Sequence, residues 1–317
     1  MTIAAAPSGQ FSFAFAGDVH FMERTATRLA ADPESAFGEA AAALSKADLT
    51  MVNLETAVTT RGQPEHKSYT FRAPASAFSA LRAAGVDIAT MANNHGADYG
   101  SVGLQDTLAA ISSSRFPVVG IGANAGRAYA PYRATINGVH IAVLAASQVP
   151  DETLANFSAD DSSAGIANAF SSQLIAAVRA AKAAGDTVIV YLHWGTEYTR
   201  CPNADQRGLA DQLAAAGATA VIGTHAHELQ GAGWRSDGVY VAYGLSNYLW
   251  WRSFGNLQDD AGLLTLTLRP NRVVAATFAP AHLDARGVPL PATGSEAARI
   301  NQQWAQDREC AGLAAEP

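Results

Sequence analysis

The chain has 317 residues, of which 49% are hydrophobic and only 15% are charged, so it can bury a sizeable core. Acidic residues outnumber basic ones by 28 to 21, a net charge of −7, and such a surface repels phosphate backbones and anionic lipid. Nucleic acid is therefore not expected as a partner. No run of about 18 apolar residues occurs, so no transmembrane segment is predicted.

The first ten residues are small and polar, without the basic and apolar regions of a signal peptide. We expect a disordered linker over residues 1–10. Two locations stay open: the cytoplasm, or the cell envelope and exterior if a signal or anchor precedes this sequence. The Ala-, Pro- and Ser-rich start favours the second.

The predicted strands and helices alternate along the first two-thirds of the chain. Segments rich in β-branched and aromatic residues predict strands at 11–16, 49–52, 88–91, 117–119, 132–136, 139–145, 187–192, 220–222, 239–243 and 263–268. Helical periodicity, often ended by glycine, predicts helices at 23–31, 33–45, 74–84, 103–113, 170–184, 205–216 and 295–305. This order predicts an α/β fold with mixed sheets.

Two segments fall outside regular structure. Residues 147–169 are polar and rich in Gly, Asp and Ser, a composition typical of a functional lid or of disorder. Residues after 289 are broken by Pro and Gly around one short helix. We therefore expect one domain over 11–289 and a C-terminal tail over 290–317.

The two cysteines, Cys201 and Cys310, stand in no spacing typical of a metal site. A disulfide that ties the tail to the loop after His193 and a pair of free thiols are both compatible with the sequence.

Polar side chains that can bind metals follow five of the predicted strands. They are Asp18, His20, Glu55, Asn94, His95, His193, His225 and His227. The carboxyl ends of strands line the ligand crevice of an α/β sheet, so we expect these side chains to meet in one pocket. Five of the eight histidines fall in this set, which a random scatter would not produce.

The residue types predict two divalent metal ions. Asp, Asn and His ligands suit Mn²⁺, Zn²⁺ or Fe²⁺, and alternate residues of Asp-x-His and His-x-His face the same way. Two cations about 3.5–4 Å apart need a shared group, for which Glu55 is the candidate. The predicted metal ligands are Asp18, His20, Glu55, Asn94, His193, His225 and His227.

Six ordered motifs carry a resemblance to a known family. They lie at 17–20 (GDVH), 52–56 (VNLET), 92–100 (ANNHGADYG), 192–198 (LHWGTEY), 222–227 (IGTHAH) and 243–247 (YGLSN). The chain resembles the CapA/PgsA family, linked to poly-γ-glutamate capsule synthesis, within the calcineurin-like metallophosphoesterase superfamily. The resemblance implies a four-layer α/β/β/α sandwich with two mixed sheets.

The resemblance also implies roles for single residues. It implies two ligand sets: Asp18, His20 and His227, and Asn94, His193 and His225. Asp18 and Glu55 would bridge the two metals, and His95 matches the general-acid histidine of the superfamily. Where its phosphoesterases have Gly-Asp-x-x-Asp, this chain has Asn53-Leu54-Glu55, the form expected of CapA, which puts phosphatase activity in doubt.

Several neighbours of these residues have more than one interpretation. Glu197 is a partner of a metal-bound histidine, an acid/base group facing the substrate, or a solvated carboxylate. Trp250 and Trp251 form a stacking wall or cover the core edge. Asn247 caps a turn or lines the pocket. Asp98 is expected to hold the turn that carries Asn94 and His95.

The resemblance implies a divalent-metal enzyme that acts on a glutamyl or peptide substrate during poly-γ-glutamate synthesis or export, with membrane-bound synthase subunits as partners. Three alternatives stay open. In a peptide epimerase, His95 and either Asp18 or Glu197 would exchange an α-proton. In a metallophosphoesterase acting on a small phosphoester, His95 would protonate the leaving group. A non-catalytic binding subunit would retain only the pocket.

Overall fold

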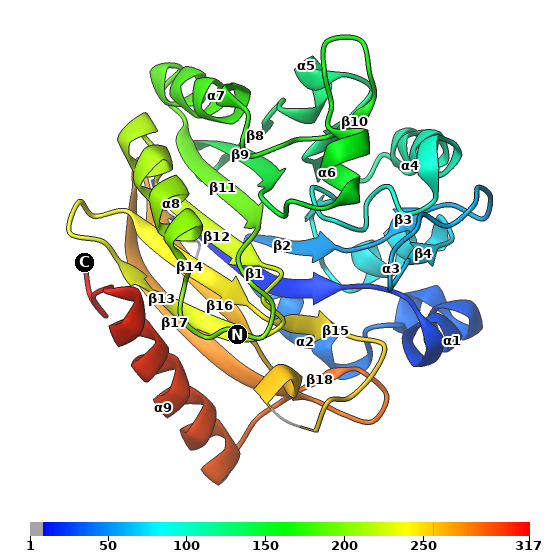
Figure 1. Cartoon of the computed structure of the whole chain (residues 1–317). Coiled ribbons are helices and arrows are strands. Elements are labelled where there is room, and N and C mark those ends of the chain that lie inside the picture. The colour runs from blue at the N-terminus through cyan, green and yellow to red at the C-terminus, as the bar shows by residue number, and fades with distance from the viewer. Residues whose placement is uncertain (1–8, 256) are drawn as a thin grey trace.

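Strand β1 (Phe11–Val19) lies inside the larger of two mixed sheets, which stack face to face between layers of helices (Figure 1). The computed structural model describes residues 9–255 and 257–317. The expected four-layer α/β/β/α sandwich is confirmed. The predicted linker over 1–10 lies outside the described residues except for its last two positions.

The larger sheet has the strand order β18-β17-β16-β1-β2-β5-β6, and β15 pairs with the end of β1. Its other strands are β2 (Leu49–Leu54), β5 (Ile88–Thr90), β6 (Val118–Val119), β15 (Asn247–Leu249), β16 (Asp260–Arg269), β17 (Arg272–Leu283) and β18 (Pro289–Pro291). The run from β1 through β2 and β5 to β6 is parallel, whereas β16, β17 and β18 are antiparallel. The parallel half brings the carboxyl ends of β1, β2 and β5 to one edge.

The smaller sheet has the order β13-β14-β12-β11-β9-β8. Its strands are β8 (Tyr132–Ile136), β9 (Val139–Ser147), β11 (Thr187–His193), β12 (Ala220–Thr224), β13 (Leu229–Trp234) and β14 (Tyr240–Leu245). The predicted hairpin turn at Asn137 and Gly138 joins β8 to β9, and both residues have the positive φ that a type I′ turn requires. Strands β9, β11, β12 and β14 are parallel.

The α-helices flank the two sheets. They are α1 (Glu23–Ala31), α2 (Ala41–Leu44), α3 (Ser76–Ala83), α4 (Gly100–Ser114), α5 (Ala125–Ala128), α6 (Glu152–Phe157), α7 (Ser172–Ala183), α8 (Ala204–Ala216) and α9 (Gly294–Ala311). Helix α8 shows how the sequence sets its ends: the Asn203 side chain caps its first turn, and Gly217 ends it with φ 105°.

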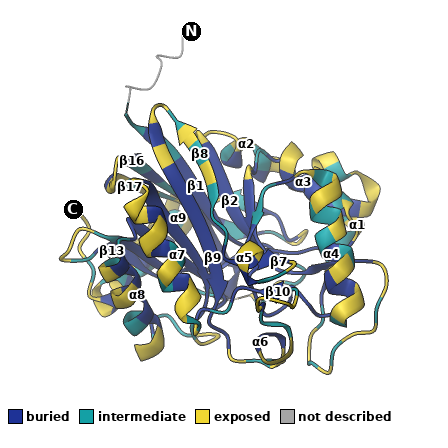
Figure 2. Ribbon diagram, turned by 90° about the horizontal axis from the view of Figure 1, so that it is seen from above, coloured by how far each residue is buried: buried dark blue, intermediate teal, exposed yellow. Residues whose placement is uncertain are grey.

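A small apolar cluster includes Phe71 and Trp250, and the rest of the core forms two larger clusters, one that includes the space between the sheets and one under α7 and α8. Alternate residues of β11 divide between them, because side chains alternate across a strand. Ile189 and Tyr191 join the layer between the sheets, and Val190 and Leu192 face the helices. Figure 2 shows the central strands as buried along most of their length.

The structure corrects four sequence-based expectations about elements. The helix expected at 33–45 is two 3-10 turns (Pro33–Ser35 and Gly38–Ala40) followed by the short α2, because Gly38 takes φ 52°. Residues 147–169 are partly regular, since they contain α6 and β10 (Gly165–Ile166), which pairs with β7 (Ile121–Gly122). Strands β13 and β17 were not expected.

The fourth correction concerns the end of the chain, where α9 is longer than the expected helix at 295–305 and packs on β13 and β17. Cys310 on α9 forms a disulfide with Cys201, whose Cα lies 5.8 Å away, so of the two interpretations the paired one is confirmed. No helix in the described part of the chain is long and apolar enough to cross a membrane.

Candidate metal centre

The predicted site residues gather at the edge where strands of both sheets end. Asp18 belongs to β1, Glu55 follows β2, Asn94 and His95 follow β5, His193 ends β11, and His225 and His227 follow β12. Two sheets therefore supply side chains to one place. Beyond β12 the backbone turns abruptly, since His225 and His227 both have positive φ (94° and 53°). Left-handed backbone at non-glycine residues is costly and concentrates at functional sites.

One nitrogen of His193 is the meeting point of several polar atoms. Its Nε2 lies 2.8 Å from Oδ1 of Asn94 and 3.1 Å from Nδ1 of His225. Oε1 of Glu55 lies 3.5 Å from the same nitrogen. One ring nitrogen makes a single hydrogen bond, so it cannot satisfy all three neighbours. A shared cation would use their lone pairs together.

Two polar side chains contact the other ring nitrogen of His193. Nδ1 lies 3.1 Å from Oγ1 of Thr224 and 3.1 Å from Nδ2 of Asn53. When Nδ1 carries the proton, Nδ1–H donates a hydrogen bond to Oγ1 of Thr224 and Nε2 is free to act as a ligand. Burial lowers the pKa of His193 and of His225 well below the ordinary value, and the neighbouring histidines lower it further. Both rings are therefore neutral, the form that binds metals.

Glu55 is a fully buried carboxyl group, and neither of its oxygens has a hydrogen-bond partner in the part of the chain that the structure describes. Burial raises its pKa well above the ordinary value, and the negative charges of Asp18, Glu197 and Asp98 raise it further. Leaving a buried carboxylate without hydrogen bonds or a counter-charge is expensive. This orphaned group among histidines fits a bound cation, and the N and O donors around it suit a divalent one.

Asp18 connects this region to His227. Its Oδ2 lies 3.7 Å from Nδ1 of His227 and accepts the backbone N–H of His225 at 3.3 Å. Its Oδ1 accepts a hydrogen bond from Asn53 at 2.7 Å. Burial raises the pKa of Asp18, against the lowering effect of the neighbouring His227. Asp18, Glu55 and His193 each offer a ligand atom within 4.8 Å of the other two.

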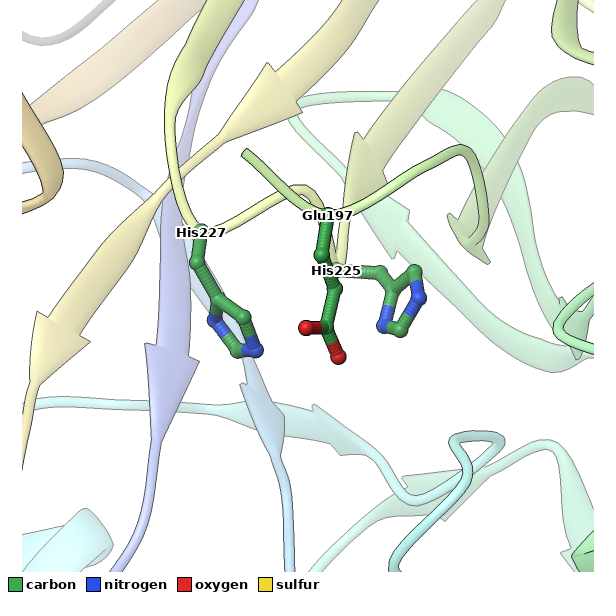
Figure 3. A group of neighbouring side chains, drawn as sticks. All are labelled: Glu197, His225 and His227. Atoms are coloured by element: carbon green, nitrogen blue, oxygen red, sulfur yellow. The ribbon is translucent and has the colours of Figure 1, made fainter. Parts of the chain in front are cut away.

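A second group of ligand atoms, equally close, comprises Glu197, His225 and His227. Figure 3 shows the Glu197 carboxylate reaching between the two imidazole rings. Glu197 is exposed and its carboxylate lies close to both histidines, and which of its three interpretations applies stays a prediction. The contacts of His225 with His193 and of Asp18 with His227 join the two groups into one centre.

His20 lies at the same edge but belongs to neither group. Its ring stacks on Trp250 at 4.0 Å, and its Nε2 accepts the backbone N–H of Trp251 at 3.2 Å. Burial lowers its pKa well below the ordinary value. Its Nδ1 is buried and has no hydrogen-bond partner, so this atom is the one through which His20 would bind a metal.

His95 is oriented by Asp98, as the expected role of Asp98 implies. Nδ1 of His95 lies 2.5 Å from Oδ2 of Asp98, and Nε2 lies 3.8 Å from Oε1 of Glu55. With Nδ1–H donating to the carboxylate, Nε2 faces the buried glutamate and can exchange a proton there.

Three residues of the site were not singled out from the sequence. Asn53 donates to Asp18 and accepts from Asn93 at 2.8 Å; its position two residues before Glu55 was the available signal. Lys67 is buried and contacts the backbone oxygen of Asn94, with Oδ1 of Asp98 at 3.0 Å. The third residue is Phe71, whose ring lies 4.2 Å from the ring of His95. Lys67 and Phe71 lie in segments without helical or strand periodicity, so the sequence pattern does not identify them as site residues.

Comparison with known proteins places these features in a family. A family model described as "Bacterial capsule synthesis protein PGA_cap" matches residues 12–250. The capsule biosynthesis protein CapA of Bacillus anthracis is 28% identical over 250 residues, covering 77% of this chain and 59% of that protein. The PGA biosynthesis protein CapA of Bacillus subtilis is 33% identical over 171 residues, 54% of this chain and 44% of its own length.

A probable polyglutamine synthesis accessory protein of Mycobacterium tuberculosis is 30% identical over 228 residues, which cover 67% of this chain and 59% of that protein. The chain thus spans about half of the length of these curated relatives. A crystal structure described as a novel phosphatase of Mycoplasma pneumoniae has a TM-score of 0.53 over 86% of this chain and 94% of its own, at 14% identity. That likeness is one of fold.

Proposed function

The chain belongs to the bacterial capsule synthesis protein PGA_cap family, and we propose that it acts in poly-γ-glutamate synthesis or export as a metal-dependent enzyme on a glutamyl or peptide substrate. The observation that carries the metal dependence is the Glu55 carboxyl group, buried without a hydrogen bond beside Nε2 of His193. Such a group is stable when a cation compensates it.

The proposed ligands form two sets, which follow the two groups of neighbouring ligand atoms. Glu55, Asn94 and His193 would hold one divalent cation, and His227 the other, with Asp18 and His225 between them. His20 would join through Nδ1. When bound, such cations polarise a carboxylate or carbonyl and acidify an adjacent proton.

The side chains around the cations would move that proton. In the tautomer that Asp98 fixes, His95 carries its proton at Nδ1 and could accept one at Nε2, and this nitrogen faces the interior of the site. Glu197 is exposed and lies against the other group of ligands. The centre therefore has an acid/base group beside each half, an arrangement that suits proton transfer to and from a bound peptide unit.

Phosphoester hydrolysis is the second candidate, favoured by the His95–Asp98 pair. An imidazole that a carboxylate orients is a suitable general acid for a leaving alkoxide. The Asn53-x-Glu55 sequence weighs against it, as it departs from the phosphoesterase pattern.

We also propose a cell-envelope location beside membrane-bound synthase subunits, since one relative is described as a synthesis accessory protein.

The experiment compares three substrates with the purified protein loaded with Mn²⁺. They are a γ-linked glutamyl oligomer, an aryl phosphate, and a peptide in D2O. Conversion of the oligomer, lost in His95→Ala and retained in the exposed-histidine control His140→Ala, supports the proposal. Turnover of the aryl phosphate alone favours hydrolysis, and deuterium at a peptide α-carbon favours epimerisation. If no substrate reacts but Mn²⁺ binds, the chain is a binding subunit.

A further inference from the structure

A series of aromatic rings leads from the metal centre to the protein surface. The Phe71 ring lies 4.2 Å from the ring of His95 and 4.3 Å from that of His20, and Phe71 is buried. The Tyr69 ring stacks beyond it at 6.5 Å, and the Tyr69 side chain is 47% exposed. Trp251, which is partly exposed, lies 6.0 Å from Tyr69 and 6.4 Å from Phe71. The rings therefore connect the buried site with solvent.

Arg252 lies among the outer rings. Its guanidinium carbon is 5.3 Å from the Tyr69 ring centroid, 4.8 Å from that of Trp251 and 4.6 Å from that of Phe254. Its Nη1 donates a long hydrogen bond of 3.5 Å to the Tyr69 hydroxyl. Its Nε is buried and has no hydrogen-bond partner among residues 9–255 and 257–317. Arginine over aromatic faces is held by cation–π attraction, which leaves the edge of the guanidinium available to a ligand.

Arg252 differs from those arginines whose charge is spent on carboxylates of the fold. Arg200 pairs with Asp307 and Arg235 pairs with Asp211 and Asp237. Arg252 makes no such ion pair with any carboxylate of the described residues. A guanidinium that keeps donors unused beside the rings that lead to the candidate metal centre is suited to an anionic ligand, because its fork matches the two oxygens of a carboxylate.

We propose that Arg252, Tyr69 and Trp251 form a subsite that binds a carboxylate of the substrate chain next to the unit held at the metal centre. This inference rests on the proposed function and names the feature that the site would recognise. A glutamyl chain carries one carboxylate per unit, separated by methylene groups and amides. The guanidinium would take the carboxylate, and the flat faces of Tyr69 and Trp251 would pack the methylenes.

The overall charge of the protein makes such a local cation necessary. The net charge is −7, so an anionic chain is repelled at long range. Phosphate esters share the oxyanion but lack the methylene and amide surface that would cover the exposed Tyr69 ring. Recognition of the glutamyl chain therefore uses both parts of the subsite, whereas recognition of phosphate would use Arg252 alone.

The test measures the affinity of the Mn²⁺-loaded full chain for a short fluorescent γ-linked glutamyl oligomer. Arg252→Gln should weaken binding about tenfold to a hundredfold, the range for loss of a charge-assisted hydrogen-bonded pair. Tyr69→Ala should weaken it less. Arg179→Gln on α7, which removes the same charge from an exposed site, should leave the affinity unchanged.

Three results with the oligomer overturn the inference: equal affinity in Arg252→Gln and the native protein, an equal loss in Arg179→Gln, or absence of oligomer binding by the native protein. If an aryl phosphate binds more tightly than the oligomer and this binding depends on Arg252, the group that the subsite recognises is a phosphate and not a carboxylate. This result also overturns the inference. Mn²⁺ affinity is measured on the same samples. If the native protein does not bind Mn²⁺, the proposed function fails. If Arg252→Gln binds Mn²⁺ as tightly as the native protein does, its weaker binding of the oligomer is a defect of the subsite alone.

Discussion

Oε1 of Glu55 lies 3.5 Å from Nε2 of His193, and both side chains are completely buried. The pair joins the carboxyl end of a strand in the larger sheet to the end of a strand in the smaller one. No hydrogen bond reaches either oxygen of Glu55. Because the two strand ends belong to different sheets, this contact exists only in the assembled sandwich, and it defines the interior of the proposed metal centre.

Cation binding should release a proton from Glu55. Its pKa is raised well above the ordinary value by burial, so the metal-free protein keeps this proton at a pH where an exposed glutamate has lost it. A cation requires the carboxylate form, so Mn²⁺ affinity should rise with pH until the proton no longer competes. Calorimetry in buffers of different ionisation enthalpy measures the protons released, and Glu55→Gln should abolish the buffer dependence. A binding enthalpy independent of buffer in the native protein would contradict this assignment.

The hydroxyl of Thr224 should tune the metal affinity through His193. Its oxygen lies 3.1 Å from Nδ1 of His193 and can accept a hydrogen bond from Nδ1–H, which is the tautomer that leaves Nε2 free. Thr224→Val keeps the shape and removes this acceptor, so Mn²⁺ binding should weaken about tenfold to a hundredfold. Thr135→Val removes a hydroxyl that contacts the exposed His140 and serves as the matched control. Equal affinities in the two variants would exclude this role for Thr224.

Lys67 should stabilise the fold as well as the site. Its ammonium group is buried between Asp98 at 3.0 Å and Asp151 at 2.9 Å, and it contacts the backbone oxygen of Asn94. Lys67→Met leaves two carboxylates without their cation, which costs about 3–5 kcal/mol. Urea denaturation measures this loss, with the exposed Lys46→Met as control. An unfolding free energy within about 1 kcal/mol of the native value would show that the network is weak.

The disulfide should anchor α9. Cys201 and Cys310 are 109 residues apart, and closing a loop of that length stabilises a fold by about 4–5 kcal/mol in the chain-entropy model. Reductant should therefore lower the midpoint of thermal unfolding of the native protein. The double variant Cys201→Ser, Cys310→Ser should already unfold at the lower temperature and show no response to reductant. A native midpoint that reductant does not change would refute the stabilising role.

The sequence was sufficient for those features that local pattern determines. The α1 prediction matches its observed bounds, and the strands that end at His193 and before His225 lie where expected. The convergence of polar residues followed from one rule, that carboxyl ends of parallel strands meet at an edge. The structure brings Asp18, Glu55, Asn94, His193, His225 and His227 together; their roles as ligands remain predictions.

Features that depend on distant partners were not accessible from local pattern. Strand β17 is largely made of small, half-exposed residues and exists through its pairing with β16. The full length of α9 depends on packing against β13 and on the bond to Cys201. The stacking of His20 on Trp250 joins residues 230 positions apart, and no spacing in the sequence announces it.

The most direct test of the metal centre is anomalous scattering from crystals of the protein grown with Mn²⁺. The account predicts two anomalous peaks, one within coordination distance of Nε2 of His193 and Glu55, the other within coordination distance of His227. Peaks should be absent around the control residue His140. If folded crystals show no peak within about 2.5 Å of a ligand atom of either His193 or His227, the metal centre proposed here does not exist.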